Sequence, residues 1–418
     1  MEKKRKAAIA RRISALYVYA LLTVFYLYLP FGGYARMMEG KFNLFLLLTV
    51  PYVLSMFVLA GQSLLTRPTA TELCAAGYLA ATVLSALLSP YGSAVLLGGS
   101  RKDGLLTVAL YVLTFLFLCR FYRVGERLLP TIALCATLCD LLVLIQLMGR
   151  NPFWLYPAGL NYFDGDIAYA GFYAGVSGNI DFTAFLLALA AAVLTAAAIR
   201  KQSLPLLLPV VLTLTVLLKL GVASALVGYG AATLFSLPFL FPRHRRAAWG
   251  LVSCTLAALL LFLLFYSGDS QTLREASALL HGEADVSFGS GRLAIWRSVL
   301  PLVAARPLFG GGAGTLHLRG LPPFYWYREG GMVEVAVTSA HNEYLGILAD
   351  QGLFALLFFL ALLLLALRRC YQKAAQDRFA LCGAALLCYG AMAFFSVSTC
   401  ITTVYLWLLL AIIARRGK

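Results

Sequence analysis

The chain has little charge for its length, few histidines, and no cysteine in its long polar segments. Charged residues make up only 12% of the 418 positions, whereas soluble globular proteins average about 25%. Together with 61% hydrophobic residues, this deficit excludes an ordinary soluble domain. The nine cysteines lie within apolar runs or at their edges, which excludes a disulfide framework in the polar segments. We interpret them as small apolar packing residues.

Apolar runs fill most of the remaining sequence. Many reach the roughly 17–25 residues that a helix needs to cross the hydrocarbon core of a bilayer. The pattern predicts an all-α, polytopic membrane protein with about twelve transmembrane helices in a single integral membrane domain, residues 1–418. The predicted membrane segments are 13–31, 42–62, 72–91, 105–122, 129–148, 179–199, 204–219, 222–241, 250–266, 343–367, 379–397 and 402–414.

The basic residues predict the orientation of these segments. Most of the 34 lysines and arginines fall in short connections on the side of the N-terminus. By the positive-inside rule, both termini then lie in the cytoplasm. We expect the membrane to be the cytoplasmic (inner) membrane. The net charge of +16 therefore indicates membrane lipids as partners and no nucleic acid. Two long loops, 150–178 and 267–342, are predicted to be extracytoplasmic, and we expect any chemistry there.

The strongest candidate site residues lie in or beside the second of these loops. Residues 289–296 read GSGRLAIW, and a helix starting here would place Arg292 and Trp296 on one face, one turn apart. A guanidinium group matches a diphosphate with paired hydrogen bonds. We predict phosphate binding by Arg292, with Trp296 and Arg297 as further substrate-binding residues. The alternative is an interfacial helix whose arginines meet lipid headgroups generically.

His341 stands where this loop re-enters the membrane, beside Asn342. An imidazole can accept the proton of an attacking hydroxyl near neutral pH, which makes His341 a catalytic candidate and Asn342 a substrate-binding one. The alternative is a capping role at a helix start. The glycine-rich residues 309–315 lack the lysine of a phosphate-binding P-loop, so we interpret them as a hinge or a place of close backbone approach.

Other polar residues give weaker signals. Lys219 and Arg101 could add cations to an outer anionic site, or could snorkel or bind headgroups. Asp140 and Asp350, within apolar runs, are interpreted as partners in hydrogen bonds between helices. The aromatic residues of loop 150–178 could contact sugar rings or form an interfacial belt.

At this point the sequence resembles a known family. The stretches GSGRLAIW, PLFGGGAG and AHNEYLGILADQGLFALL are similar to those of bacterial O-antigen ligases and polysaccharide polymerases, which are multi-spanning glycosyltransferases of the GT-C type. The resemblance covers roughly residues 178–367. It implies transfer of a glycan from a polyprenyl diphosphate donor to a hydroxyl of a glycan, lipid or protein acceptor, on the outer face of the membrane. It also implies that Arg292 holds the diphosphate, that His341 activates the acceptor, and that no metal or other cofactor is used.

One departure from the family and two alternatives remain open. Members often carry an arginine where this chain has Ala223, and Lys219, one helical turn earlier, could supply the charge. A polysaccharide polymerase would use the same donor as a ligase. A non-catalytic transporter of lipid-linked oligosaccharides is the second alternative, although it should show inverted repeats and ionisable residues deep in the bundle.

Overall fold

The computed structural model describes residues 2–60, 67–156, 174–328 and 331–415. Each of the twelve predicted apolar segments contains a helix. These helices are α1 (Glu2–Ala20, continued by the π-helix η1, Leu21–Phe25), α2 (Met37–Ala60), α3 (Ala70–Leu87), α5 (Leu105–Phe121), α6 (Leu128–Leu147), α7 (Ile180–Lys201), α8 (Leu207–Leu220), α9 (Ala223–Phe235), α11 (Arg245–Leu264), α14 (Glu343–Gln372), α15 (Asp377–Ala393) and α16 (Thr403–Ala414). Within the described ranges, seven helical stretches are long and apolar enough to cross a membrane. The chain is therefore a polytopic helical membrane protein, and the number of twelve crossings stays a prediction.

Shorter elements connect these helices. They are η2 (Tyr34–Arg36), α4 (Ala94–Leu97), η4 (Pro152–Trp154), η5 (Gly175–Ser177), η6 (Leu204–Leu206), α10 (Leu237–Leu240), η7 (Pro242–His244), α12 (Gln271–Leu280), α13 (Arg292–Ala305), η8 (Leu316–Leu318), β1 (Phe324–Arg328) and β2 (Gly331–Val335). The strands β1 and β2 pair as an antiparallel hairpin, which the all-α prediction did not include. Part of the aromatic loop, residues 157–173, lies outside the described residues, so the predicted sugar contact there is untested.

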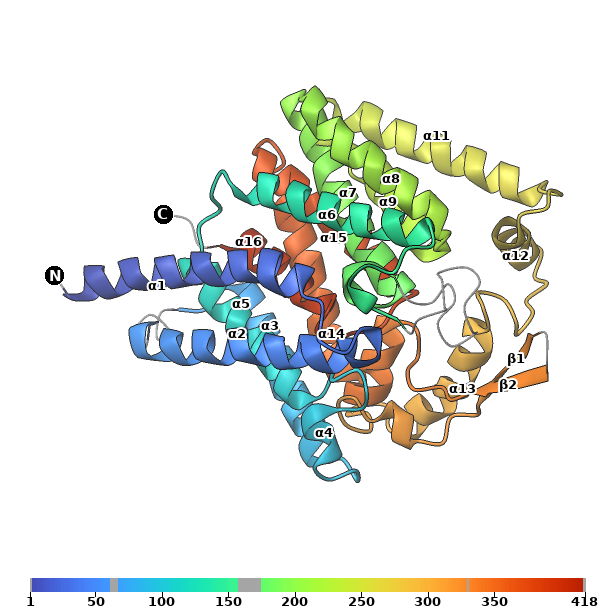
Figure 1. Ribbon diagram of the computed structural model, residues 1–418, viewed down its shortest axis with the longest axis horizontal. Coiled ribbons are helices and arrows are strands. Elements are labelled where there is room, and N and C mark those ends of the chain that lie inside the picture. The colour runs from blue at the N-terminus through green and yellow to red at the C-terminus, as the bar shows by residue number, and fades with distance from the viewer. Residues whose placement is uncertain (1, 61–66, 157–173, 329–330, 416–418) are drawn as a thin grey trace.

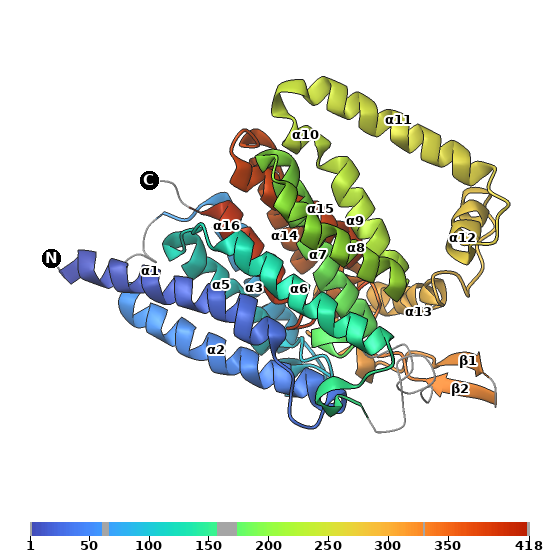
Figure 2. The same ribbon diagram turned by 45° about the horizontal axis from the view of Figure 1, so that its top comes forward.

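The long helices run side by side as a tilted bundle (Figure 1). The N-terminus and the C-terminus lie at one end of it, whereas α12, α13 and the hairpin lie at the other end (Figure 2). This arrangement places the segment 267–342 on the side opposite to both termini. Helix α11 lies at the edge of the bundle, and most of its side chains are exposed.

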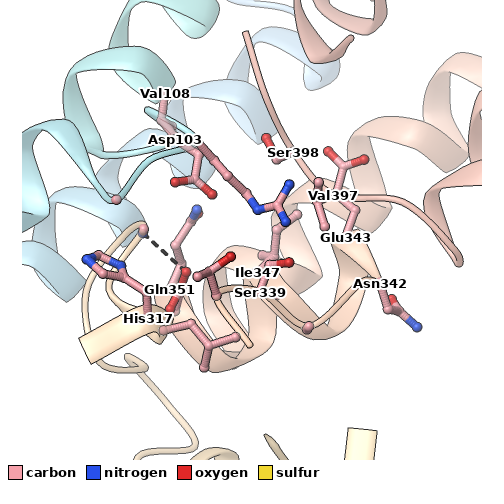
Figure 3. A pocket seen from close by; sticks show the side chains of 18 of the residues that line it. Asp103, Val108, His317, Ser339, Asn342, Glu343, Ile347, Gln351, Val397 and Ser398 are labelled. Atoms are coloured by element: carbon pink, nitrogen blue, oxygen red, sulfur yellow. Dashed lines mark hydrogen bonds between the residues drawn. The ribbon is translucent and has the colours of Figure 1, made fainter. Parts of the chain in front are cut away.

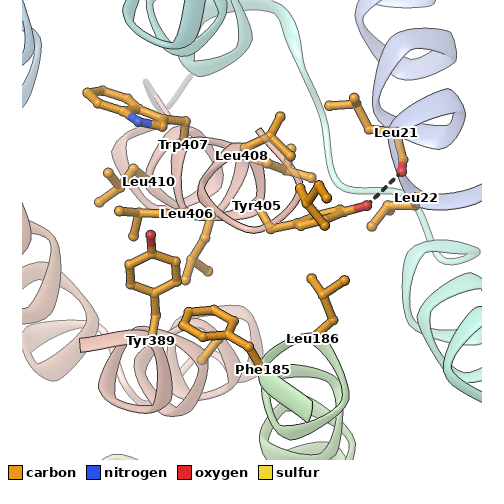
Figure 4. Close-up of a cluster of buried hydrophobic side chains, with 14 of the residues drawn as sticks. Leu21, Leu22, Phe185, Leu186, Tyr389, Tyr405, Leu406, Trp407, Leu408 and Leu410 are labelled. Atoms are coloured by element: carbon orange, nitrogen blue, oxygen red, sulfur yellow. Dashed lines mark hydrogen bonds between the residues drawn. The ribbon is translucent and has the colours of Figure 1, made fainter. Parts of the chain in front are cut away.

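Helix α16 forms the centre of the bundle. It is apolar around its whole circumference, and such a helix is stable only when it is surrounded on all sides. Its residues are buried throughout, among them Tyr405 and Trp407 (Figure 4). The Tyr405 hydroxyl donates a hydrogen bond to the carbonyl oxygen of Leu21, 3.1 Å away, in the π-helical turn of the first span. The core thus joins the two ends of the chain.

Helix α14 is interrupted near the outer end of the bundle. Gly352 has φ 85° and ψ −179°, a conformation that glycine adopts readily and other residues do not. A Cβ atom at this position would lie 2.3 Å from the carbonyl oxygen of Leu308, so the backbone after α13 passes directly against the break. The amide of Leu353 then donates to the Pro307 carbonyl over 2.9 Å. The break therefore attaches the outer segment to the start of α14.

Candidate active site

A left-handed turn sets the start of α13. Gly289, Ser290 and Gly291 have φ values of 63°, 57° and 79°, a run that the two glycines make accessible. Helix α13 begins at the next residue, Arg292, whose Nη1 donates to the Gly289 carbonyl over 2.8 Å. The Gly-Ser-Gly sequence thus forms the turn that presents the arginine, and its guanidinium group is held against that turn.

Trp296 lies one helical turn after Arg292 and connects α13 to the histidine segment. Its indole N–H donates to the carbonyl oxygen of Ala340, at 3.0 Å. Around this bond, Ile295 and Val299 pack with Ala340 in a small apolar cluster. The spacing of arginine and tryptophan therefore has a structural consequence, because fixing Trp296 to residue 340 brings Arg292 near residue 341.

His341 precedes α14 in a left-handed conformation, with φ 47°. Its neighbour Asn342 is the N-cap of α14, and the Asn342 side chain accepts a hydrogen bond from the Leu345 amide over 3.0 Å. Figure 3 shows the Asn342 side chain directed away from the other labelled side chains. The capping role considered for this segment is thus performed by Asn342. In the part of the chain that the structure describes, the His341 ring forms no hydrogen bond.

Two arginines from distant segments act on His341. Arg101 lies between α4 and α5, and both its Nε and that of Arg292 are buried without a hydrogen-bond acceptor in the described residues. Burial, followed by the positive charges of Arg101 and Arg292, lowers the pKa of His341 to about 3. The imidazole is consequently neutral at physiological pH. The carboxylate of Asp181, at the start of α7, interacts electrostatically with both arginines.

A polar pocket opens beside this group (Figure 3). Its walls come from the α4–α5 connection, from residues 314–317, from the start of α14 and from the α15–α16 connection. Two predicted site residues, Arg101 and Asn342, line the pocket. Ala340 lines it too, so both sequence neighbours of His341 face this space. Among the groups that face the pocket, burial raises the pKa of Asp103, while Arg101 and His317 oppose that rise.

The glycine-rich segment forms the floor of this region by close backbone approach, as one of its two interpretations predicted. A Cβ atom on Gly314 would lie 2.7 Å from the Cα atom of Gly98, and one on Gly99 would lie 2.7 Å from the ring of His317. Side chains at these positions would separate the two loops. The glycines therefore bring the α4–α5 connection, which carries Arg101, against the loop that follows α13.

An ion pair that sequence reasoning missed fixes the same loop to α14. Arg319 donates to Asp350 over 2.8 Å and to the Ala349 carbonyl over 2.7 Å. The other carboxylate oxygen of Asp350 accepts from the Gly314 amide at 3.2 Å. Asp350 was expected to bond between helices, but its partner is a loop. No pattern in the sequence relates two residues thirty-one positions apart, although a carboxylate in an apolar run signals that some partner exists.

The remaining candidates lie apart from the pocket. Arg297 is exposed on α13 and contributes to lowering the pKa of Asp285, after the hydrogen bonds that Ser287 donates. Lys219 is exposed in the last turn of α8. Asp140 accepts a hydrogen bond from Thr213 of α8 at 2.6 Å, which confirms its predicted interhelical role. Among the described residues, no group of three or more His, Cys, Asp or Glu side chains could hold a metal ion.

Fold and site together define a class: a polytopic helical membrane protein with a cationic, histidine-containing site at one end of its bundle. Residues 208–360 match the family model described as O-antigen ligase, which supports the resemblance that the motifs predicted. The matched segment includes Lys219, Arg292, Trp296, Arg297, His341 and Asn342, but not Arg101. No curated protein matches the chain.

Proposed function

We propose that this protein transfers a glycan from a polyprenyl diphosphate donor to an acceptor hydroxyl at the outer face of the cytoplasmic membrane. The observation that carries the proposal is the convergence of Arg101, Arg292 and a neutral His341 beside one pocket. The arginines would bind the diphosphate of the donor, and His341 would accept a proton beside the same reacting atoms. The family match supports this class of reaction, which belongs to polysaccharide biosynthesis.

The proposed step is a displacement at the sugar carbon that carries the diphosphate. The bond between this carbon and the diphosphate oxygen breaks, and its electron pair leaves with the polyprenyl diphosphate. The acceptor oxygen forms the new bond, and its proton passes to the imidazole of His341. Arg101 and Arg292 stabilise the negative charge that develops on the leaving phosphate. Within the described residues neither arginine forms an ion pair, so their Nε groups can bind the leaving group without first losing one.

Donor binding would also raise the basicity of His341. In the free protein, burial and then the charges of the two arginines hold the pKa of His341 low. A bound diphosphate offsets their charge and so raises the basicity of the imidazole. The base is then strongest when the donor is present, which favours transfer after both substrates have bound.

The test uses purified protein in liposomes, with lipid-linked glycan extracted from a strain that lacks the protein, together with its membrane acceptors. We expect His341→Ala to reduce transfer by about 10²–10⁴-fold, the usual contribution of a general base. Arg292→Gln should reduce it by about 10²–10³-fold, as expected on losing a charge-stabilising group. Arg274→Gln is the matched control, because Arg274 is exposed on α12 in the same outer segment.

Transfer by both His341→Ala and Arg292→Gln at the rate of the Arg274→Gln control would contradict the proposal. The size of the product separates the related functions. A single conjugate indicates a ligase, and a ladder of lengths indicates a polymerase. Donor that crosses the membrane without forming a new bond indicates a transporter.

A further inference from the structure

The pocket beside His341 contains more polar groups than a phosphate site needs. Three of them border the same space: Asp103 comes from the α4–α5 connection, and Ser339 and Glu343 lie on either side of His341 (Figure 3). Ser398 and the aromatic ring of Tyr78 complete the walls. The two carboxylates make this space unsuitable for the diphosphate itself, because like charges repel one another. A ligand for this pocket must therefore be neutral and rich in hydrogen-bonding groups.

Within the described residues, one of these groups lacks a hydrogen-bond partner and another lacks an ion pair. Ser339 is 8% exposed, and its buried hydroxyl forms no hydrogen bond within the described residues. Asp103 forms no ion pair within 4 Å in the described part of the chain, although Arg101 interacts with it electrostatically. Buried polar groups normally find partners, so an unpaired hydroxyl in a pocket wall indicates a missing ligand or water.

Glu343 is held in place by the protein. The Tyr389 hydroxyl donates to its two carboxylate oxygens at 2.8 and 3.1 Å. This bond uses one donor only, so lone pairs of the carboxylate remain available to a ligand. Asp350, by contrast, is already bonded to Arg319 and to the Gly314 amide. The carboxylates with remaining capacity are thus Asp103 and Glu343.

We propose that this pocket is a subsite for one pyranose ring of the glycan, with Asp103, Glu343 and Ser339 bonded to its ring hydroxyls. Sugar hydroxyls both donate and accept, so they match a wall that combines carboxylates with a serine and an arginine N–H. Since Arg101, Ala340 and Asn342 also line it, a bound ring lies next to the base and to the phosphate-binding cations.

This inference rests on the proposed function, in which two sugars come close to the reacting atoms. One is the donor sugar attached to the diphosphate, and the other is the acceptor sugar whose hydroxyl attacks. The chemistry that the pocket recognises is the same for both. Titration of each substrate in turn identifies which of them occupies it.

The experiment measures transfer by Ser339→Ala and Asp103→Asn in liposomes while donor and acceptor are varied separately. We expect the KM for one of the two substrates to rise about tenfold for Ser339→Ala and more for Asp103→Asn, because hydrogen bonds to a charged group are stronger. The kcat should change less than threefold. Asp285→Asn is the matched control, since Asp285 is an exposed carboxylate of the same outer segment.

Ser339→Ala distinguishes an effect on ligand binding from an effect on the stability of the fold. Because the Ser339 hydroxyl has no partner in the described protein, its loss should leave the thermal unfolding temperature of the free protein unchanged. A rise in the donor KM assigns the ring to the donor, and a rise in the acceptor KM assigns it to the acceptor. Unchanged KM values for both substrates in both variants would overturn the subsite while leaving the transfer reaction intact.

A second measurement tests the sugar subsite even if the wild-type protein shows no transfer. The probe is the oligosaccharide released from its lipid by mild acid, which carries no diphosphate. Its addition should raise the unfolding temperature of the wild type and of His341→Ala, and should raise that of Ser339→Ala and Asp103→Asn less. An equal effect on all four proteins, or no effect on any, contradicts the subsite.

Discussion

At the scale of the residue, the electrostatic environment of His341 leads to a prediction. Arg101→Gln removes a positive charge that disfavours the protonated imidazole, so the pKa of His341 should rise from about 3 towards the unperturbed value of about 6.5. Activity that needs the neutral ring is lost as pH falls through this pKa, so the acid limb of the kcat/KM profile should move to higher pH. NMR titration of ring-labelled histidine, with His341→Gln to assign the signal, measures the shift.

Lys102→Gln is the matched control for this titration, because the adjacent lysine is not among the charges that act on His341. Addition of donor to the wild type should shift the histidine signal in the same direction as Arg101→Gln. A pKa of His341 that is identical in wild type and Arg101→Gln would show that burial alone sets it.

Lys219 provides a second prediction at this scale. It is exposed in the last turn of α8 and does not line the pocket, whereas Arg101 does. We therefore expect Lys219→Ala to retain more than half of the wild-type surface glycan in a complementation assay, and Arg101→Ala to retain little. A loss with Lys219→Ala as severe as that with Arg292→Gln would instead identify Lys219 as a substitute for the family arginine.

The sequence identified individual site residues better than their partners. Arg292 and Trp296 were placed on one helical face by their spacing, and α13 confirms this. Asp103 and Ser339 were not identified, because short polar residues in loops carry no periodic signal. Their place in the pocket follows from the folding of segments more than two hundred residues apart.

At the scale of the element, the glycine-rich loop can be tested by adding single methyl groups. Gly314 has φ +67°, and its Cβ atom would collide with the backbone of Gly98. Gly314→Ala should lower the free energy of unfolding by about 2–4 kcal/mol, through conformational strain together with overpacking. Thermal or denaturant unfolding in detergent measures the change.

Gly320→Ala is the control for this substitution. Gly320 has nearly the same φ, +65°, but nothing lies within 4 Å of the position of its Cβ atom. It should therefore show only the strain contribution, about 1 kcal/mol. Equal losses in the two variants would mean that close approach of the loops adds nothing to stability.

At the scale of the whole molecule, the orientation in the membrane is testable. Both termini lie at one end of the bundle, opposite α12, α13 and the hairpin. We expect a fluorescent protein fused after residue 418 to fold in the cytoplasm, and alkaline phosphatase fused after Ser270 to be active outside it. Fluorescence from a fluorescent protein fused after Ser270, with phosphatase activity from alkaline phosphatase fused after residue 418, would invert the topology and place the site on the cytoplasmic side.

The helical plan was the most predictable feature at this scale. Apolar length alone located a helix in each of twelve segments, because a chain in lipid must satisfy its backbone hydrogen bonds internally. The interruption of α14 at Gly352 and the hairpin were not foreseen. Both depend on contacts with distant parts of the chain, which local periodicity does not encode.

The bond from the Trp296 indole to the Ala340 carbonyl has a consequence for the length of glycan that the site can accept. Because it couples α13 to the residue before the histidine, it keeps a constant spacing between Arg292 and His341. A site with this fixed spacing would recognise only the diphosphate and the sugar attached to it. Under the proposed function, glycans of any length would then be accepted equally, because the rest of the glycan lies beyond the spacing that this bond fixes.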